Sequence, residues 1–282
     1  MQVQSIAESL FFTTVRIDTR KPNGDTGSGT GFLFAHRIDA DRHIPFIVTN
    51  KHVVRGSQTG SLTFHQKQGD KLELGKGFRV DIGDWDASWF DHPSPDIDIA
   101  VVPFIAIESY VKQTSSVDLF YRYVTSDMLA TPAQLESLDA IEPVTFIGYP
   151  NGIWDSRNLL PVARRGTTAT PMSVDYEGKP TFLIDASVFG GSSGSPVFVV
   201  HNGMIPDKFG NTMIGTRAIF VGVVAAVFFR SALNEIIAVP IPTNVGSVPM
   251  ARQREMLDLG VVFKASTVVD AAAAWVAAHG GA

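Results

Sequence analysis

The nine residues from 189 to 197, with the sequence FGGSSGSPV, constrain the fold more than any other stretch of the chain. Apolar runs rich in β-branched and aromatic residues flank this stretch, over 181–188 and 197–200. Such runs predict two β-strands joined by a tight turn. Glycines let the backbone of that turn adopt conformations closed to other residues and approach a second molecule closely. A serine held there lies beside several backbone N–H groups, which can stabilise a negative charge on a reacting oxygen.

Two catalytic patterns fit this turn. The pattern G-x-S-x-G would make Ser192 the nucleophile on an elbow that leads into a helix. The run 197–200 predicts a strand instead, and only His201 and His279 follow as histidines, so the context of an elbow is missing. The second pattern is G-x-S-G-S-P, in which Ser193 is the nucleophile. This pattern requires a histidine and an aspartate elsewhere in the chain.

A histidine and two aspartates lie upstream of the turn in suitable positions. His52 follows the apolar run 44–49, which predicts a strand. Asp96 and Asp98 both fall within the run 95–102, which also predicts a strand. Because side chains two apart on a strand point to the same face, alternation does not choose between these aspartates.

Together these segments resemble the chymotrypsin-like (trypsin-fold) serine peptidases, of the bacterial trypsin-like type with a G-x-S-G-S-P nucleophile turn. The family's chain order is His, Asp, Ser, and its Asp-Ile/Leu-Ala pattern selects Asp98 over Asp96. The separations of 98 − 52 = 46 and 193 − 98 = 95 residues are close to those of the family's two-barrel layout. One departure is that small residues usually precede the family's histidine, whereas Asn50 and Lys51 precede His52.

The resemblance implies an all-β fold with two six-stranded antiparallel Greek-key β-barrels and a C-terminal α-helix. We expect a single trypsin-like peptidase domain over 1–282, because no room remains for an appended domain. Its expected parts are an N-terminal barrel with His and Asp over 1–125, a crossover over 126–142, a C-terminal barrel with Ser over 143–250, and a C-terminal segment with the helix over 251–282.

The sequence also makes finer structural predictions. Trp85 and Trp89 are expected to anchor the polar loop 81–95 on the first barrel. The segment Pro240-Ile241-Pro242 is expected to close the second barrel, and the Ala-rich stretch 270–279 to form the C-terminal helix. The remaining histidines stand in no catalytic pattern and are expected to face solvent: His36, His43, His65, His92, His201 and His279.

The resemblance implies a catalytic role for each matching residue. Since a serine hydroxyl is a weak nucleophile, His52 would take the proton of Ser193 and later donate it to the leaving amine. Asp98 would hold the imidazole tautomer and stabilise the imidazolium. The backbone N–H groups of Gly191 and Ser193 would form the oxyanion hole.

Substrate preference follows from the residues that match the family's specificity pocket. Ser187, six before the nucleophile, falls at the pocket base and supplies no charge to select Arg or Lys. The apolar run 220–227 matches the strand that lines the pocket, with Ala225, Ala226 and Val227 at its end. Val227 stands where many relatives have glycine, so it should narrow the pocket. We therefore predict small or medium apolar residues before the cleaved bond.

Composition excludes several other classes of protein. A formal net charge of −5 disfavours a nucleic-acid partner, which usually needs a basic face. The chain has no cysteine, so it has no disulfide or thiolate nucleophile. Neither a signal peptide nor a membrane span stands out, which predicts a cytoplasmic protein without membrane contact. No metal-ligand spacing such as H-E-x-x-H occurs, so we assign no metal and no cofactor.

The sequence thus predicts a serine endopeptidase that acts on polypeptides through an acyl-enzyme, as a monomer or small oligomer. Two alternatives remain open. One is a catalytically silent or latent binding or regulatory module on the same fold. The other is a serine esterase that uses the same site on a non-peptide acyl group.

Overall fold

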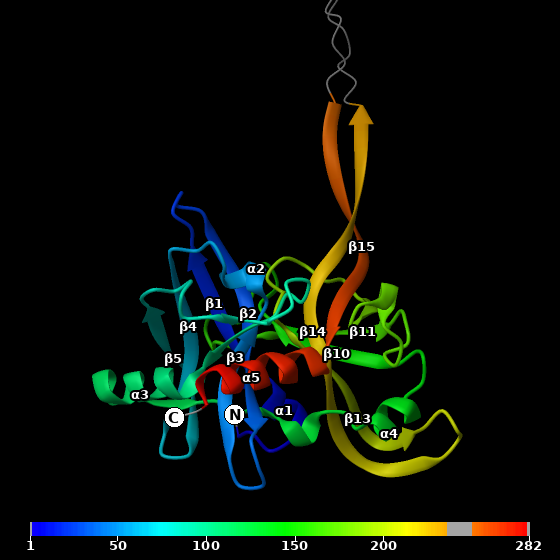
Figure 1. Ribbon diagram of the computed structural model, residues 1–282, viewed down its shortest axis with the longest axis horizontal. Helices are drawn as coiled ribbons and strands as arrows, with labels where there is room; N and C mark the ends of the chain where they lie inside the picture. Colours follow the sequence, from blue (N-terminus) through cyan, green and yellow to red (C-terminus); the bar gives the residue numbers. More distant parts are fainter. Residues whose placement is uncertain (1, 236–249, 281–282) are drawn as a thin grey trace, which may run out of the picture.

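A computed structural model describes residues 2–235 and 250–280, which form two β-sheets joined by a helical crossover (Figure 1). The first sheet has the strand order β5-β4-β1-β2-β3-β7-β6, while β8 pairs with β4 and β9 with β2. Its strands are β1 (Thr14–Arg20), β2 (Thr26–Arg37), β3 (His43–Thr49), β4 (Thr59–Gln68), β5 (Lys71–Ile82), β6 (Phe90–Asp91), β7 (Ala100–Pro103), β8 (Asp118–Phe120) and β9 (Val124–Thr125).

The second sheet is a closed six-stranded barrel with the order β10-β11-β12-β15-β14-β13 and antiparallel pairing throughout. The predicted all-β class with two β-units is confirmed, although the first sheet carries the additional short strands β6, β8 and β9. The strands of the second sheet are β10 (Pro143–Gly148), β11 (Val162–Thr168), β12 (Thr181–Asp185), β13 (Pro196–Pro206), β14 (Thr212–Glu235) and β15 (Met250–Lys264).

Short helices lie at the ends and in the connections of the sheets. Among the residues that the structure describes, no helix is both long and apolar enough to cross a membrane. The α-helices are α1 (Ile6–Leu10), α2 (Lys51–Val54), α3 (Phe104–Ser115), α4 (Pro132–Ser137) and α5 (Ala265–His279). Single 3₁₀ turns occur at Ser126–Met128, Pro150–Gly152 and Tyr176–Gly178.

The largest apolar cluster joins the two sheets to each other and to α5. Phe32 and Phe34 of β2 face this cluster, while Leu33 between them belongs to the separate core of the first sheet, as the alternation of a strand requires. Phe32 meets Phe220 of β14 with 5.3 Å between ring centroids. Val268 of α5 is also fully buried in this cluster. The two sheets are therefore joined by one continuous apolar interface.

Two predicted boundaries near the C-terminus differ from the structure. The second barrel extends past residue 250, because β15 pairs with both β12 and β14 and so closes it. The segment 240–242, to which closure was assigned, lies outside the described residues. The C-terminal helix begins at Ala265 rather than at 270. The β-branched residues of its first turns have low helix propensity, so the sequence does not indicate a helix there. Burial of Val268 against the core stabilises the helix at this end.

The two tryptophans anchor the connection between β5 and β7, as the sequence predicts. Trp85 and Trp89 are buried and meet edge to face with 5.3 Å between ring centroids. The indole Nε1 of Trp85 donates a hydrogen bond of 3.1 Å to the carbonyl oxygen of Val54, at the end of α2. The connection is thereby fixed beside the helix that carries His52.

The prediction that the other histidines face solvent is wrong for His65 and His92, which are both buried. The ring of His65 packs edge to face on Phe12, with 5.1 Å between centroids. Burial lowers the pKa of His65 to about 4, because removal from water disfavours the charged ring. Aromatic packing thus makes His65 a neutral core residue.

Candidate active site

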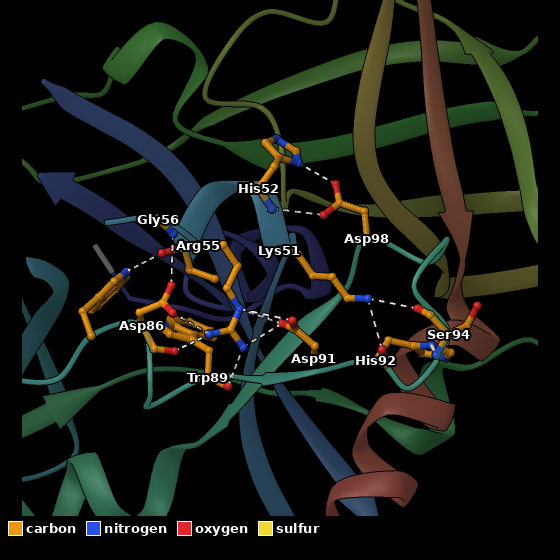
Figure 2. A network of polar contacts seen from close by, with 12 residues as sticks. Lys51, His52, Arg55, Gly56, Asp86, Trp89, Asp91, His92, Ser94 and Asp98 are labelled. Carbon is orange, nitrogen blue, oxygen red and sulfur yellow. Dashed lines mark hydrogen bonds and ion pairs between the residues drawn. The ribbon is translucent and has the colours of Figure 1, made fainter. Parts of the chain in front are cut away.

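His52 and Asp98 form a close pair between the two sheets (Figure 2). The ring nitrogen Nδ1 of His52 lies 2.5 Å from Oδ2 of Asp98, and the backbone N–H of His52 donates to Oδ1 at 3.1 Å. The carboxylate thus holds both the ring and the backbone of the histidine. An aspartate on Nδ1 favours the tautomer whose Nε2 is free to accept a proton, which a general base needs.

The two residues before His52 hold the segment that carries Asp98. The amide Nδ2 of Asn50 donates to the backbone carbonyl of Asp98 at 2.7 Å. Nζ of Lys51 donates to the carbonyl oxygens of His92 and Ser94, at 3.1 and 2.9 Å (Figure 2). The departure from small residues at these positions therefore has a structural role, since both side chains hold the segment 92–98 through its backbone carbonyl groups.

Arg55 fastens the start of the same loop. Its guanidinium makes hydrogen bonds of 2.9 to 3.2 Å to both carboxylate oxygens of Asp91, and one of 2.8 Å to the carbonyl of Trp89 (Figure 2). Asp86 accepts the backbone N–H of Gly56 at 3.0 Å. Because Arg55 lies three residues after His52, its hydrogen bonds connect the segment that carries His52 to the loop that leads to Asp98.

The choice between the two aspartates is resolved by geometry rather than by strand alternation. Neither Asp96 nor Asp98 lies in a strand, because β7 begins only at Ala100. The argument that both point to one face of a strand was therefore wrong. Asp98 contacts His52, whereas Asp96 is exposed on the preceding turn.

The turn between β12 and β13 takes a conformation that requires glycine at two points. Gly191 has φ 81° and Gly194 has φ 85°. A Cβ on Gly191 would lie 2.5 Å from the carbonyl oxygen of Tyr149, and one on Gly194 would overlap the carbonyl of Thr30 and approach Oγ1 of Thr49. These close approaches pack the turn against β2 and against the end of β3, three residues before His52. The turn is therefore packed against the end of the strand that leads to His52.

Two consecutive peptide groups of this turn are held from outside it. The carbonyl oxygen of Gly190 accepts the backbone N–H of Asn151. Oγ1 of Thr30 donates to the carbonyl of Gly191 at 2.9 Å and accepts the N–H of Tyr149 at 3.0 Å. With the Gly190 carbonyl directed to Asn151, the N–H on the opposite side of the same planar peptide, that of Gly191, points away from it.

Asn151 occupies an unusual conformation at this contact. Its φ is 50°, in the left-handed region that favours glycine and tolerates asparagine. The residue lies in the 3₁₀ turn Pro150–Gly152, whose carbonyl at Gly152 accepts a hydrogen bond of 3.0 Å from Arg16. Nothing in the sequence near residues 148–152 indicates that this turn contacts the serine loop.

Ser193 is the accessible serine of the turn. Ser192 and Ser195 are buried, while Ser193 is half-buried. Oγ of Ser193 lies 3.5 Å from the carbonyl oxygen of Ala225, and within the described residues it makes no hydrogen bond to His52. In the same part of the chain, the N–H groups of Gly191 and Ser193 donate to no protein acceptor. Such donors remain available to the carbonyl oxygen of a bound substrate.

The predicted pocket residues lie on both sides of this turn. Ser187, between β12 and the turn, is half-buried. On β14, Ala225 is buried and Ala226 is exposed. Val227 is half-buried and packs against the core of the second barrel. Among the described residues, no group of three His, Cys, Asp or Glu side chains could hold a metal ion.

Comparison with known proteins identifies the family. Residues 29–205 match the family described as "Trypsin-like peptidase domain". Because this match spans 177 of the 282 residues, the chain belongs to the trypsin-like peptidase family. No curated protein matches the chain.

Several solved structures are similar to it. The Rv3671c protease from M. tuberculosis in its active form is 18% identical, with a TM-score of 0.44 over 96% of this chain and 82% of that one. The HtrA-type protease AlgW is 14% identical, with a TM-score of 0.48 over 98% and 65%. The tobacco etch virus protease is 13% identical, with a TM-score of 0.43 over 81% and 73%.

Proposed function

We propose that the protein is a serine endopeptidase in which Ser193 attacks the carbonyl carbon of a peptide bond. The observation that carries this proposal is the Nδ1 contact of His52 with Asp98, together with the packing of the turn that bears the accessible Ser193 against the end of the strand leading to His52. The membership of the chain in the trypsin-like peptidase family supports the same assignment.

The proposed reaction assigns a role to each of these residues. Nε2 of His52 takes the proton of Ser193 as the hydroxyl attacks, and the imidazolium then protonates the leaving amine. Asp98 keeps the ring oriented and stabilises its positive charge. The N–H groups of Gly191 and Ser193 stabilise the oxyanion of each tetrahedral intermediate. Water activated by His52 then hydrolyses the acyl-enzyme.

The hydroxyl of Ser193 has to turn from the carbonyl of Ala225 towards His52 before it can react. Catalytic hydrogen bonds often form fully only when substrate is bound. The same feature favours a second candidate function, a latent binding module in which the serine stays turned away.

We also propose that the enzyme prefers small or medium apolar residues before the cleaved bond. Ser187 offers no charge for Arg or Lys, and Ala225 and Val227 offer apolar surface.

A peptide library tests both proposals. We expect cleavage after small or medium apolar residues such as Ala or Val by the wild-type protein, and none by Ser193→Ala. Cleavage mainly after Lys or Arg would contradict the predicted preference. Turnover of esters without any peptide cleavage would favour an esterase. If the protein turned over neither esters nor peptides, a binding module would be favoured.

A further inference from the structure

The guanidinium of Arg16 links the two sheets at the turn that follows β10. Arg16 lies in β1 of the first sheet. Its Nη1 donates a hydrogen bond of 3.0 Å to the carbonyl oxygen of Gly152, in the 3₁₀ turn Pro150–Gly152 beyond β10 of the second sheet. The two residues are 136 positions apart in the chain. One side chain of the first sheet therefore holds a turn of the second.

The position of this guanidinium is fixed on two further sides. Asp18, two residues along β1, accepts hydrogen bonds from Nε at 3.0 and 2.9 Å and from Nη2 at 2.8 Å. The guanidinium also lies over the ring of Trp154, with 4.7 Å from Cζ of Arg16 to the ring centroid. The side chain of Arg16 is 18% exposed. The planar fork of an arginine can serve a carboxylate, a carbonyl oxygen and an aromatic face together, which an ammonium group does not.

The turn that Arg16 holds depends on contacts from outside it. Asn151 and Gly152 have φ values of 50° and 69°, both in the left-handed region. An asparagine there is held at a cost in energy, and such conformations persist where surrounding contacts impose them. The hydrogen bond from Arg16 to the carbonyl oxygen of Gly152 is a contact of this kind.

The same turn orients the peptide group between Gly190 and Gly191. The backbone N–H of Asn151 donates to the carbonyl oxygen of Gly190, so the N–H of Gly191 points to the opposite side. Rotation of this peptide group changes only the backbone angles of two glycines, for which opposite orientations are sterically open. Its orientation is therefore set from outside, by the contact with Asn151. Loss of that contact would let the Gly190 carbonyl take the place of the Gly191 N–H.

We propose that Arg16 is a positioning residue for the oxyanion hole. It holds the turn Pro150–Gly152, whose Asn151 N–H keeps the Gly191 N–H directed to the reacting carbonyl oxygen. This inference rests on the proposed peptidase function and deepens it, since it assigns a residue of the first sheet to stabilisation of the transition state. Removal of an interaction that is made only in the transition state lowers kcat and leaves KM unchanged.

Steady-state kinetics on an internally quenched peptide with Val before the scissile bond test the inference. Arg16→Met keeps an unbranched side chain beside Trp154 but removes the hydrogen bond to Gly152. We expect kcat to fall at least about tenfold, towards the roughly 10²–10³-fold loss that follows removal of an oxyanion donor, with KM within about threefold of wild type. Arg20→Met is the matched control, because it removes an exposed arginine of the same strand, and its kinetics should equal those of wild type.

Two binding measurements separate positioning from a general loss of structure. Addition of Ser193 Oγ to a peptide boronate of the same sequence gives a tetrahedral analogue of the transition state, so its Ki should rise by the factor by which kcat falls. The Kd of the uncleaved peptide for Ser193→Ala should change by less than about threefold when Arg16→Met is added, because ground-state binding does not depend on this donor.

A conservative variant keeps the test valid if Arg16→Met does not fold. Arg16→Lys retains the positive charge beside Asp18 but has no planar fork. It should therefore have the stability of wild type in urea denaturation and still lose about threefold or more in kcat, with KM unchanged.

Other results would overturn the inference. They are a wild-type kcat in folded Arg16→Met or Arg16→Lys, a loss confined to KM, an unchanged Ki of the boronate beside a reduced kcat, or an equal loss in Arg20→Met. Failure of the peptidase function is distinguishable, because wild type and Arg20→Met would then also cleave no peptide.

Discussion

Replacement of Thr30 by valine should disturb the candidate active site through one buried hydroxyl. Thr30 is fully buried in β2. Oγ1 donates to the carbonyl of Gly191 at 2.9 Å and accepts the N–H of Tyr149 at 3.0 Å. The backbone N–H of Thr30 donates to the carbonyl of Ser193 at 3.0 Å, and a valine keeps this contact. The Thr30→Val variant therefore removes only the hydroxyl, at nearly constant volume.

The magnitude follows from the two partners that are left behind. A buried polar group without a partner costs about 1–3 kcal/mol, so Thr30→Val should lower the free energy of unfolding by about 2–6 kcal/mol. The turn should also lose the contact that orients its Gly191–Ser192 peptide. Because loss of one oxyanion donor reduces kcat by roughly 10²–10³ in related chemistry, partial disorder of the turn should slow acylation by tenfold or more.

Urea denaturation measures the first effect, and the second-order rate of fluorophosphonate labelling measures the second. Thr30→Ser is the matched control, because it retains the hydroxyl and should restore most of the labelling rate while losing the buried methyl. A Thr30→Val protein with unchanged stability and labelling rate would refute the assignment of Thr30 as a positioning residue.

Three further outcomes are expected. Asp98→Asn should reduce kcat about 10⁴-fold with little change in stability, as loss of the histidine's orienting carboxylate does in chymotrypsin-like serine peptidases. Kinetics at saturating substrate and urea denaturation check this. Gly191→Ala should abolish activity, since its Cβ would lie 2.5 Å from the Tyr149 carbonyl at φ 81°; wild-type kinetics from this variant would contradict the placement of the turn. His65→Phe should make the free energy of unfolding less dependent on pH below 7. The pKa of His65 is about 4 in the folded protein and ordinarily 6.5, so the unfolded chain binds the extra proton as the pH falls. The free energy of unfolding of wild type should therefore decrease by about 3 kcal/mol more than that of the variant between pH 7 and pH 4, as urea denaturation at each pH would measure.

The features that the sequence predicts best depend on short stretches. The Gly-Ser turn at 189–197 and the strands that flank it follow from local composition. The pairing of His52 with Asp98 was expected from a family pattern in which each residue is recognised by the short sequence motif around it. Local signals suffice for these because β-branched runs and glycine turns act within a few residues.

The features that the sequence does not predict depend on contacts between distant segments. Thr30 and Gly191 are 161 residues apart, and nothing near Thr30 indicates its partner. His65 resembles any surface histidine until its ring is placed on Phe12. The length of β14 was also missed, because its continuous apolar run ends at Phe229 while pairing with β15 continues to Glu235. Tertiary packing overrides local pattern in all three cases.

Intact-mass analysis after treatment with a fluorophosphonate tests the central claim most directly. This reagent adds covalently only to a serine whose hydroxyl is activated by a base and whose oxyanion hole is formed. The account predicts one adduct on wild type and on Ser192→Ala, and none on Ser193→Ala. An adduct that persists on Ser193→Ala, or the absence of any adduct on folded wild type, would contradict the assignment of Ser193 as the nucleophile.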